Sequence, residues 1–459
     1  MKRLVICFDG TWNRLDAPYP TNVVITAESV LPQASDGTAQ AIFYDEGIGT
    51  GKWEKYTGGI FGAGMVENLG DAYRFLIFNH TPGDQIYVFG FSRGAYTARS
   101  FAGMLSTCGL LQRSDASKVT EAIERYQNRK GDSTAFAAEM MAFRSNYSPA
   151  LCVSDEDEAW RCANVKGYTA GQSGRLKIDY LGVWDSVGAL GIPARYKLLA
   201  FLNRQHQFHD TRLSPFIKSA RHAVAIDEHR RDFLPTLWDN VAELNVGVGA
   251  DEKADDAPYQ QRWFPGVHGA VGGGGERRGL SDQALDWVLD GARKCGLEFD
   301  GVPQSRIFEL SPDYKDHLQN ALPVARPGII SRIMDLLPKV DRVPGPKLLH
   351  EVSISARRRW LDKPENLKDK TAYKPKTLAN VSAILSGLDA QTLGVGVEPP
   401  TEILAIHRVV PGDGLNAIAM QYYNDHTKAP DIFKANLDKL EHPDRIYVGQ
   451  SLRIPRLGR

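Results

Sequence analysis

Ser92 stands in the stretch YVFGFSRGAYTARS, residues 87–100, as the serine of a Gly-x-Ser-x-Gly motif formed with Gly90 and Gly94. The run just before the motif, Ile86 to Phe89, is apolar and predicts a buried strand. The residues after it carry apolar side chains at helical spacing. A sharp strand-to-helix turn lifts a serine hydroxyl above a sheet, so this context is typical of a nucleophile. A tight turn with an incidental serine is the alternative.

A serine nucleophile needs a general base, and the base needs an acid that orients it. His268 is the candidate base, because RWFPGVHGAVGGGGERRG is an aromatic run leading into a glycine-rich loop that allows close backbone approach. Asp185 is the candidate acid, because it follows the apolar run Ile178 to Trp184 and so lies at the carboxyl end of a strand. The chain order Ser, Asp, His is that of α/β-hydrolases. A structural glycine loop and a turn aspartate are the alternatives.

Attack by a serine on a carbonyl group also needs backbone N–H donors for the oxyanion. Two candidates are Gly10, in the loop that follows the first expected strand, and Arg93, the residue after the nucleophile. Asp9, which precedes Gly10, is explained equally well as a turn aspartate bonded to its own loop.

Two other chemistries have weaker support. EGIGTGKW, residues 46–53, resembles a phosphate loop, but Glu46 stands where the first glycine is required and Trp53 follows the lysine. Histidines and aspartates at metal-ligand spacing occur in two groups: His206, His209 and Asp210, and His222, Asp227 and His229. The second group lies in ARHAVAIDEHRRDF, which we expect to be helical. Packing or capping accounts better for these histidines, so we expect neither a metal nor a cofactor.

The composition is that of a soluble globular protein. With 459 residues the chain is long enough for two or three domains, and its 42% apolar and 24% charged content is ordinary. The formal net charge of zero gives no global field toward nucleic acid, so we expect no nucleic-acid partner. The five cysteines include no C-x-x-C pair and predict reduced thiols, although a Cys152–Cys162 disulfide after export is an open alternative.

The N-terminal sequence MKRLVICFDGTWN predicts a first strand rather than a signal peptide, since its apolar run is too short. No apolar run approaches the roughly 20 residues of a membrane-spanning helix. We therefore expect synthesis in the cytoplasm without a signal peptide.

Alternating strands and helices predict an α/β fold with a mostly parallel sheet covered on both faces. The expected strands are Leu4 to Phe8, Ala41 to Tyr44, Ile86 to Phe89, Lys177 to Val183 and Val241 to Val246, and helices are expected at Val66 to Phe78 and Val119 to Tyr126. Residues 130–175 look polar and irregular, and together with 190–220 and 300–375 we interpret them as cap insertions. The basic stretch ARRRWLDKPENLKDKTAYKPK predicts a solvated face, with a phospholipid-headgroup patch as the alternative.

Glycine and proline near residues 393–402 indicate a linker. The following residues show a strand–helix–helix–strand pattern, with strands at His407 to Val410 and Ser451 to Ile454. VVPGDGLNAIA, Asn436 and DRIYVGQSLRIP make this segment resemble the LysM module, a family that binds N-acetylglucosamine polymers such as peptidoglycan. We thus predict a hydrolase domain over 1–390, a linker over 391–404 and a LysM domain over 405–457.

Eight further motifs occur in order over residues 1 to about 375: ICFDGTWN, YDEGIGTG, GFSRGAYTARSFAGML with CGLL, LGVWDSVGALG, RHAVAIDEHRRDF, WFPGVHGAVGGG, LSDQALDWV and LLHEVSISARRRW. Together they resemble the α/β-hydrolase domain family that includes the type VI secretion phospholipase effectors. The resemblance implies a catalytic triad of Ser92, Asp185 and His268. The chain has Gly269-Ala270 where the family has Ser-Asp, and His350 in the last motif is a reserve base.

The resemblance implies a serine hydrolase of the phospholipase A type that cleaves phospholipid esters as an antibacterial effector. It also implies action in the periplasm of a target cell and an immunity protein in the producer. The LysM module implies either peptidoglycan binding or docking on the secretion apparatus. An esterase of cell-wall or polysaccharide esters, and a non-catalytic peptidoglycan-binding protein, are the alternative functions.

Overall fold

A computed structural model describes most of the chain. The described residues are 1–10, 15–47, 60–129, 134–188, 212–301, 305–307, 310–320, 339–396, 402–410, 412–437, 440, 443–444, 446 and 450–457. Most of the expected phosphate-like loop, residues 48–53, lies outside the described residues. His206 and His209 lie outside them as well.

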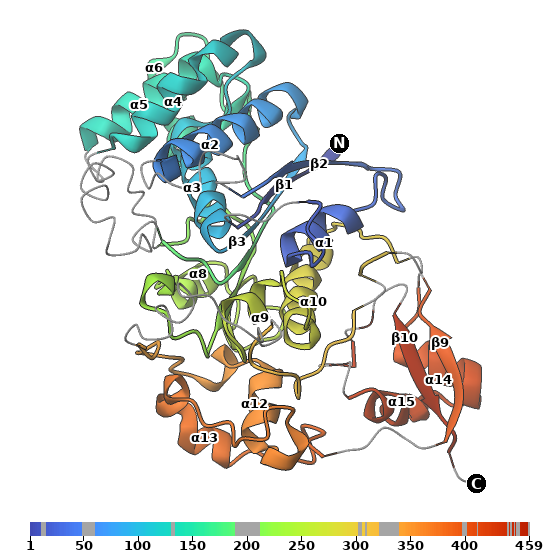
Figure 1. The fold of residues 1–459 in the computed structure, drawn as a ribbon. Coiled ribbons are helices and arrows are strands. Elements are labelled where there is room, and N and C mark those ends of the chain that lie inside the picture. Colours follow the sequence, from blue (N-terminus) through green and yellow to red (C-terminus); the bar gives the residue numbers. More distant parts are fainter. Residues whose placement is uncertain are drawn as a thin grey trace.

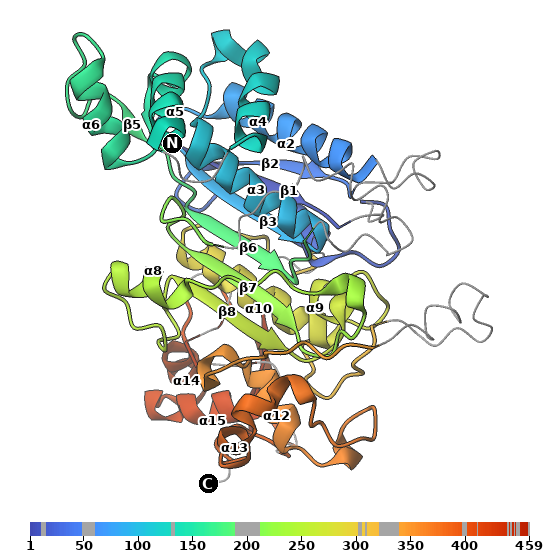
Figure 2. The same cartoon turned by 90° about the vertical axis from the view of Figure 1, so that its left-hand side faces the viewer.

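A six-stranded sheet forms the centre of the larger domain, and its neighbouring strands are all parallel. The strands are β1 (Lys2–Phe8), β2 (Ala39–Asp45), β3 (Gln85–Phe91), β6 (Tyr180–Trp184), β7 (Ala220–Ala225) and β8 (Tyr259–Phe264). Their order is β2-β1-β3-β6-β7-β8, which Figure 2 shows across the sheet. The chain reverses its direction of strand addition between β1 and β3, and ligands of such sheets bind at that switch point.

Helices cover both faces of the sheet, as a buried parallel sheet requires (Figure 1). One face packs against α2 (Ile60–Asn79), α3 (Arg93–Cys108) and α4 (Val119–Gln127). The other face packs against α1 (Asn22–Ser29) and α10 (Gly279–Lys294). The predicted α/β class is confirmed, and the side chains of β1 divide between the two cores in the alternation expected of a strand.

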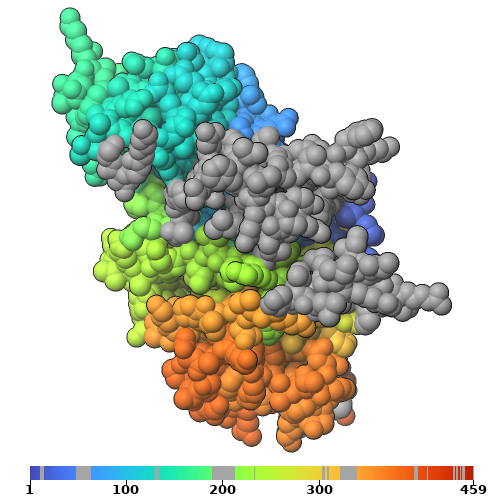
Figure 3. Space-filling view, turned by 60° about the vertical axis from the view of Figure 1, so that its left-hand side comes forward, coloured from blue at the N-terminus to red at the C-terminus, as the bar shows by residue number. Residues whose placement is uncertain are grey.

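The segment predicted to be irregular contains regular structure, so that prediction was wrong. It holds α5 (Thr134–Tyr147), β4 (Leu151–Cys152), α6 (Asp155–Asn164) and β5 (Gly174–Arg175). The polar sequence is misleading because Asp157, which is fully buried, pairs with Arg144 and Arg161 instead of facing solvent. These elements lie at one end of the molecule, and the residues that follow residue 340, coloured orange, lie at the other (Figure 3).

Two secondary-structure predictions are corrected. Residues 241–246 form helix α8 (Val241–Gly247) rather than a strand, and Val246 is 76% exposed. The stretch expected to be helical supplies β7 instead, and every residue of β7 is buried. A strand covered on both faces shows no apolar–polar alternation, which is why its sequence is easily mistaken for a buried helix.

After β8 the chain forms α9 (His268–Gly272), α10, α12 (Ile354–Leu361) and α13 (Ser382–Ser386). Short 3-10 helices lie at Arg113–Lys118, Arg231–Phe233, Leu349–Glu351, Pro364–Asn366, Lys376–Val381 and His426–Lys428. The predicted solvated basic face is partly wrong, because Arg358 and Arg359 are buried and donate to backbone carbonyls. None of the described helices has the length and apolar character needed to cross a bilayer.

The C-terminal module has the expected β-α-α-β order. It consists of β9 (Ile403–Arg408), α14 (Leu415–Tyr423), α15 (Ala429–Ala435) and β10 (Ser451–Pro455), and the two strands pair antiparallel. Buried Asn436 donates to the carbonyls of Ile432 and Arg453 and accepts from the Arg453 N–H. Figure 1 shows the module beside the larger domain.

Candidate active site

Ser92 lies in the turn between β3 and α3 with a left-handed backbone, φ 59° and ψ −122°. Non-glycine residues rarely adopt this conformation, and functional sites are where it concentrates. Its N–H donates to the Trp184 carbonyl at 3.0 Å, and its carbonyl accepts from the Val187 N–H at 3.2 Å. Hydrogen bonds to the end of β6 therefore hold the turn in its strained form.

The two glycines of the motif are required by packing. A Cβ on Gly90 would lie 2.5 Å from the Gly94 carbonyl oxygen. One on Gly94 would lie 2.2 Å from the carbonyl oxygen of Phe8 and 2.4 Å from that of Asp9. The glycines thus let α3 start directly against β3 and against the loop that follows β1, which is the packing that a nucleophile elbow needs.

Asp185 follows β6 and is fully buried. Its backbone also has a positive φ, 38°, and its N–H donates to the Ala223 carbonyl at 2.7 Å. The Ala225 N–H donates to Asp185 Oδ1 at 2.9 Å. The carboxylate is therefore positioned by the carboxyl end of β7 as well as by its own strand.

His268 connects the other two candidate residues. Its Nδ1 lies 2.6 Å from Asp185 Oδ2, and its Nε2 lies 2.8 Å from Ser92 Oγ. Three residues separated by up to 176 positions thus form one hydrogen-bonded chain at the carboxyl edge of the sheet. The arrangement has the geometry of a nucleophile, a base and an orienting acid.

Aromatic and acidic neighbours fix the imidazole. The His268 ring lies between Phe91 and Phe233, with ring centroids 4.7 and 4.8 Å away. The His268 backbone N–H donates to Glu228 Oε2 at 3.2 Å. Burial lowers the pKa of His268, while Asp185 and Glu228 act in the opposite direction, so the ring favours its neutral, basic form.

Arg342 is a site residue that the sequence analysis missed. Its side chain is 1% exposed and forms a two-point ion pair with Asp185, Nη1 to Oδ1 at 2.5 Å and Nη2 to Oδ2 at 2.9 Å. Burial alone would raise the pKa of Asp185, but the Arg342 charge and the hydrogen bonds from His268 and Arg342 hold it well below its usual range. Asp185 is consequently ionised at every ordinary pH, and Nδ1 of His268 carries the proton that it donates.

The proposed oxyanion donors have different environments. Arg93 is the first residue of α3 and directly follows Ser92. The Gly10 N–H donates to Asp9 Oδ1 at 2.6 Å, and Asp9 Oδ2 accepts from the hydroxyls of Thr21 and Tyr44. Asp9 therefore organises its own loop, and that loop lies against the elbow at Gly94.

Within the described part of the chain, the candidates His222, His229 and His350 share no hydrogen bond with the three residues of the hydrogen-bonded chain. His222 is buried, accepts from the Ser186 N–H and bonds Gln261, whereas His229 pairs with Asp341. The described residues contain no group of three or more histidine, cysteine, aspartate or glutamate side chains placed to hold a metal. His350 lies on the 3-10 helix Leu349–Glu351, and it is His268 that bonds the serine.

Gly269 stands where the sequence comparison expects a serine, and this difference has a steric explanation. A Cβ on Gly269 would lie 2.5 Å from the amide nitrogen of Asn320, so the glycine allows that side chain to pack against the start of α9. Cys152 and Cys162, which were an open disulfide candidate, are both free thiols.

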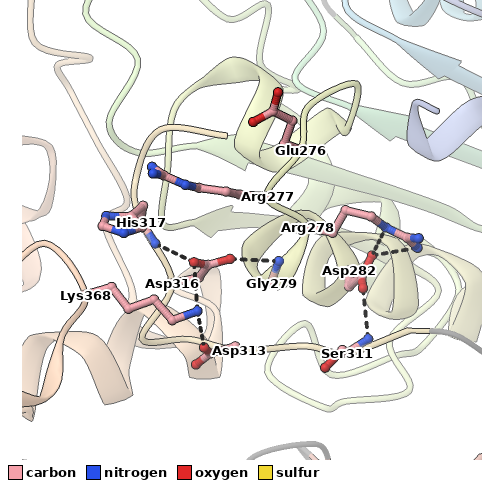
Figure 4. A pocket seen from close by; sticks show the side chains of 10 residues that line it. All are labelled: Glu276, Arg277, Arg278, Gly279, Asp282, Ser311, Asp313, Asp316, His317 and Lys368. Carbon is pink, nitrogen blue, oxygen red and sulfur yellow. Dashed lines mark hydrogen bonds and ion pairs between the residues drawn. The ribbon is translucent and has the colours of Figure 1, made fainter. Parts of the chain in front are cut away.

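A polar hollow of about 520 Å³ opens beside the N-terminus of α10 (Figure 4). Several of its charged groups pair with one another: Lys368 bonds Asp313 and Asp316, each at 3.0 Å, and Arg278 bonds Asp282 at 3.1 Å. None of the three residues that form the hydrogen-bonded chain lines it.

Comparison with known families gives two matches. The family described as "T6SS, Phospholipase effector Tle1-like, catalytic domain" matches residues 2–291, and the LysM domain matches residues 407–455. The first match covers more than half of the chain and includes all three residues of the hydrogen-bonded chain.

Two individual proteins match parts of this chain. An uncharacterized protein of Saccharomyces cerevisiae, YEL023C, is 28% identical over 247 residues, which are 50% of this chain and 32% of that protein. The potassium binding protein Kbp of Escherichia coli O6:H1 is 39% identical over 82 residues, 18% of this chain and 54% of that protein. The chain therefore spans only part of the length of the curated relatives it matches.

Two solved structures are similar to this chain at low scores. The Tle1 effector bound to the VgrG spike of the type 6 secretion system shares 18% identity with a TM-score of 0.30, over 59% of this chain and 51% of that one. An uncharacterized protein from Pseudomonas aeruginosa shares 13% identity with a TM-score of 0.38, over 96% of this chain and 64% of that one.

Proposed function

The chain belongs to the family of Tle1-like phospholipase effectors of the type VI secretion system, and from this premise we propose that it is a serine hydrolase that cleaves carboxylic esters of phospholipids. The observation that carries the proposal is the hydrogen-bonded chain from Asp185 through His268 to Ser92. Family membership supports the lipid ester as substrate, and the residue geometry supports the mechanism.

In the proposed mechanism Ser92 Oγ attacks the ester carbonyl carbon while His268 Nε2 accepts the hydroxyl proton. The tetrahedral intermediate collapses, the C–O bond to the leaving alcohol breaks, and His268 returns the proton to that alcohol. A lysophospholipid leaves and an acyl-Ser92 ester remains. Water then attacks the acyl group with His268 again as base, which releases the fatty acid and restores the serine hydroxyl.

Asp185 keeps the imidazole in the tautomer that presents a lone pair to Ser92 and stabilises the imidazolium that forms. The Arg93 N–H is the first proposed oxyanion donor, by virtue of its place directly after the nucleophile. Gly10 is the second, and its N–H has to turn from the Asp9 carboxylate toward the oxyanion when substrate is bound.

The family and the LysM module also suggest how the protein is exported and where it acts. We propose that the chain is exported by a type VI system and acts in the periplasm of a target cell, with an immunity protein protecting the producer. The LysM module supports retention on peptidoglycan, and docking on the secretion apparatus is the other use of the same module.

The test is fatty-acid release from mixed phospholipid vesicles by the wild type, with Ser92→Ala and Ser106→Ala beside it. Ser106 lies on α3 and bonds the Gly103 carbonyl, so its substitution is a matched control for loss of a serine on the same helix. We expect release by the wild type and the control, and none by Ser92→Ala.

A fluorophosphonate probe separates the remaining functions. Labelling of Ser92 without lipid release directs the search to acetylated glycans, which the LysM module would select. Absence of both release and labelling in folded protein refutes the catalytic proposal and leaves a glycan-binding protein. Binding to isolated peptidoglycan tests the LysM module separately.

A further inference from the structure

Arg342 places a full positive charge directly beside Asp185, the candidate acid of the site. The guanidinium makes four hydrogen bonds in a fully buried setting. Nη1 donates to Asp185 Oδ1 and to the Ala225 carbonyl at 2.8 Å, and Nη2 donates to Asp185 Oδ2 and to the Phe233 carbonyl at 2.5 Å. One side chain thus ties the turn after β6, the end of β7 and the segment that packs on the His268 ring.

The carboxylate of Asp185 has no remaining orientational freedom. Oδ1 accepts from the Ala225 N–H and from Arg342 Nη1, while Oδ2 accepts from His268 Nδ1 and from Arg342 Nη2. Two-point pairing of arginine with a carboxylate fixes the plane of both groups. The direction in which Oδ2 faces His268 is therefore set by Arg342.

Both carboxylates that bond His268 are matched by an arginine. Asp185 pairs with Arg342, and Glu228 pairs with Arg230 through Nε to Oε1 at 2.9 Å and Nη2 to Oε2 at 2.7 Å. Phe91, Phe233 and the Ser92 hydroxyl, which also contact the ring, carry no charge. Protonation of His268 consequently adds a positive charge beside two carboxylates that already have arginine partners.

We propose that Arg342 is a positioning residue that orients Asp185 and offsets its charge, so that His268 stays a neutral base into acidic solution. This inference deepens the proposed function and rests on it for its catalytic meaning. A triad without such an arginine would protonate its histidine at higher pH, since the carboxylate would favour the imidazolium undiminished.

The experiment compares wild type, Arg342→Gln, Arg342→Lys and Arg221→Gln in the full-length chain. Arg221 is a buried arginine that pairs with Asp290, so it controls for the general loss of a buried cation. The readout is the acid limb of kcat/KM for a soluble p-nitrophenyl ester. We expect the midpoint to rise by about one pH unit in Arg342→Gln and to stay near the wild-type value in Arg342→Lys and Arg221→Gln.

A purely structural role of Arg342 predicts a different result for the midpoint. If Arg342→Gln lowers kcat but leaves the midpoint unchanged, the electrostatic role is refuted. If that variant does not fold, Arg342→Met takes its place, and the same comparison with the wild-type midpoint decides.

A second readout separates this proposal from the proposed function. The ring signals of His268 can be titrated by NMR in the wild type and in Arg342→Gln, with a His268→Gln spectrum for assignment, whether or not any ester is cleaved. A midpoint about one pH unit higher in Arg342→Gln supports the role of Arg342 even if the lipid substrate proves wrong. Equal midpoints in the two proteins overturn it even if Ser92 is the nucleophile.

Discussion

Gly94→Ala is the sharpest test of whether the elbow geometry serves the chemistry. The new methyl carbon would lie 2.2 Å from the Phe8 carbonyl oxygen and 2.4 Å from that of Asp9. Both contacts are to backbone at the end of β1, and a backbone atom cannot rotate away as a flexible side chain can. Either the loop after β1 or the start of α3 has to move.

The size of that movement follows from the contact. Since Cβ contacts under 3.0 Å are essentially never seen, the displacement is at least about 0.8 Å, the difference between 3.0 and 2.2 Å. Overpacking of this kind costs roughly 1–3 kcal/mol of stability, and the gain of alanine over glycine in a helix returns only ~0.5–1 kcal/mol. A misplacement of about 1 Å in a reacting group lowers rates by about 100-fold.

The assay is kcat/KM on a soluble ester together with urea unfolding, and Gly70→Ala is the matched control. Gly70 lies within α2, and a Cβ there meets only the flexible end of Arg74 at 3.2 Å and Ile123 Cδ1 at 3.5 Å. We expect the control to keep its activity and to gain up to about 1 kcal/mol of stability. Wild-type activity and stability in Gly94→Ala would show that the close packing against β1 is not needed.

Three further outcomes are expected. His222 has its pKa lowered to about 3 by burial, from 6.5, so the free energy of unfolding should fall as pH drops from about 6.5 toward 3, and His222→Gln should reduce that fall in urea titrations. In native protein a maleimide should label exposed Cys162 and spare buried Cys7 and Cys108 until the chain unfolds, as mass spectrometry would report. Asn436→Ala should cost the LysM module about 1–3 kcal/mol by leaving buried backbone groups unpaired, and should leave ester hydrolysis unchanged.

The hydrogen-bonded arrangement of Ser92, His268 and Asp185 was predictable because each of the three residues has a local signal. Ser92 lies in a recognisable strand-turn-helix motif, Asp185 ends an apolar strand and His268 follows another. Parallel strands bring their carboxyl ends to one edge of the sheet, so three local signals become one site without any knowledge of long-range contacts. The structure places them within hydrogen-bonding distance, as predicted. Their catalytic role stays a prediction.

Arg342 was not predictable by the same route. It lies 157 residues from Asp185, in a proline-containing stretch with no helical or strand periodicity. An arginine in such a stretch is ordinarily assigned to solvent. The basic run that follows misleads in the same way, since Arg358 and Arg359 use their several donors to satisfy backbone carbonyls inside the protein. Charge patterns in sequence do not distinguish a solvated guanidinium from a buried one.

The contacts of Arg342 also bear on where the hydrolase unit ends. The family match stops at residue 291, yet the partner of Asp185 comes from residue 342, and Val352 pairs with Trp263 at the end of the sheet. A chain cut after α10 would leave Asp185 buried without its counter-charge and Trp263 without part of its core. The free energy of an uncompensated buried charge is several kcal/mol, a large share of the stability of a domain. The functional unit implied by these contacts therefore extends past the matched region, toward the boundary near residue 390 that the sequence predicts.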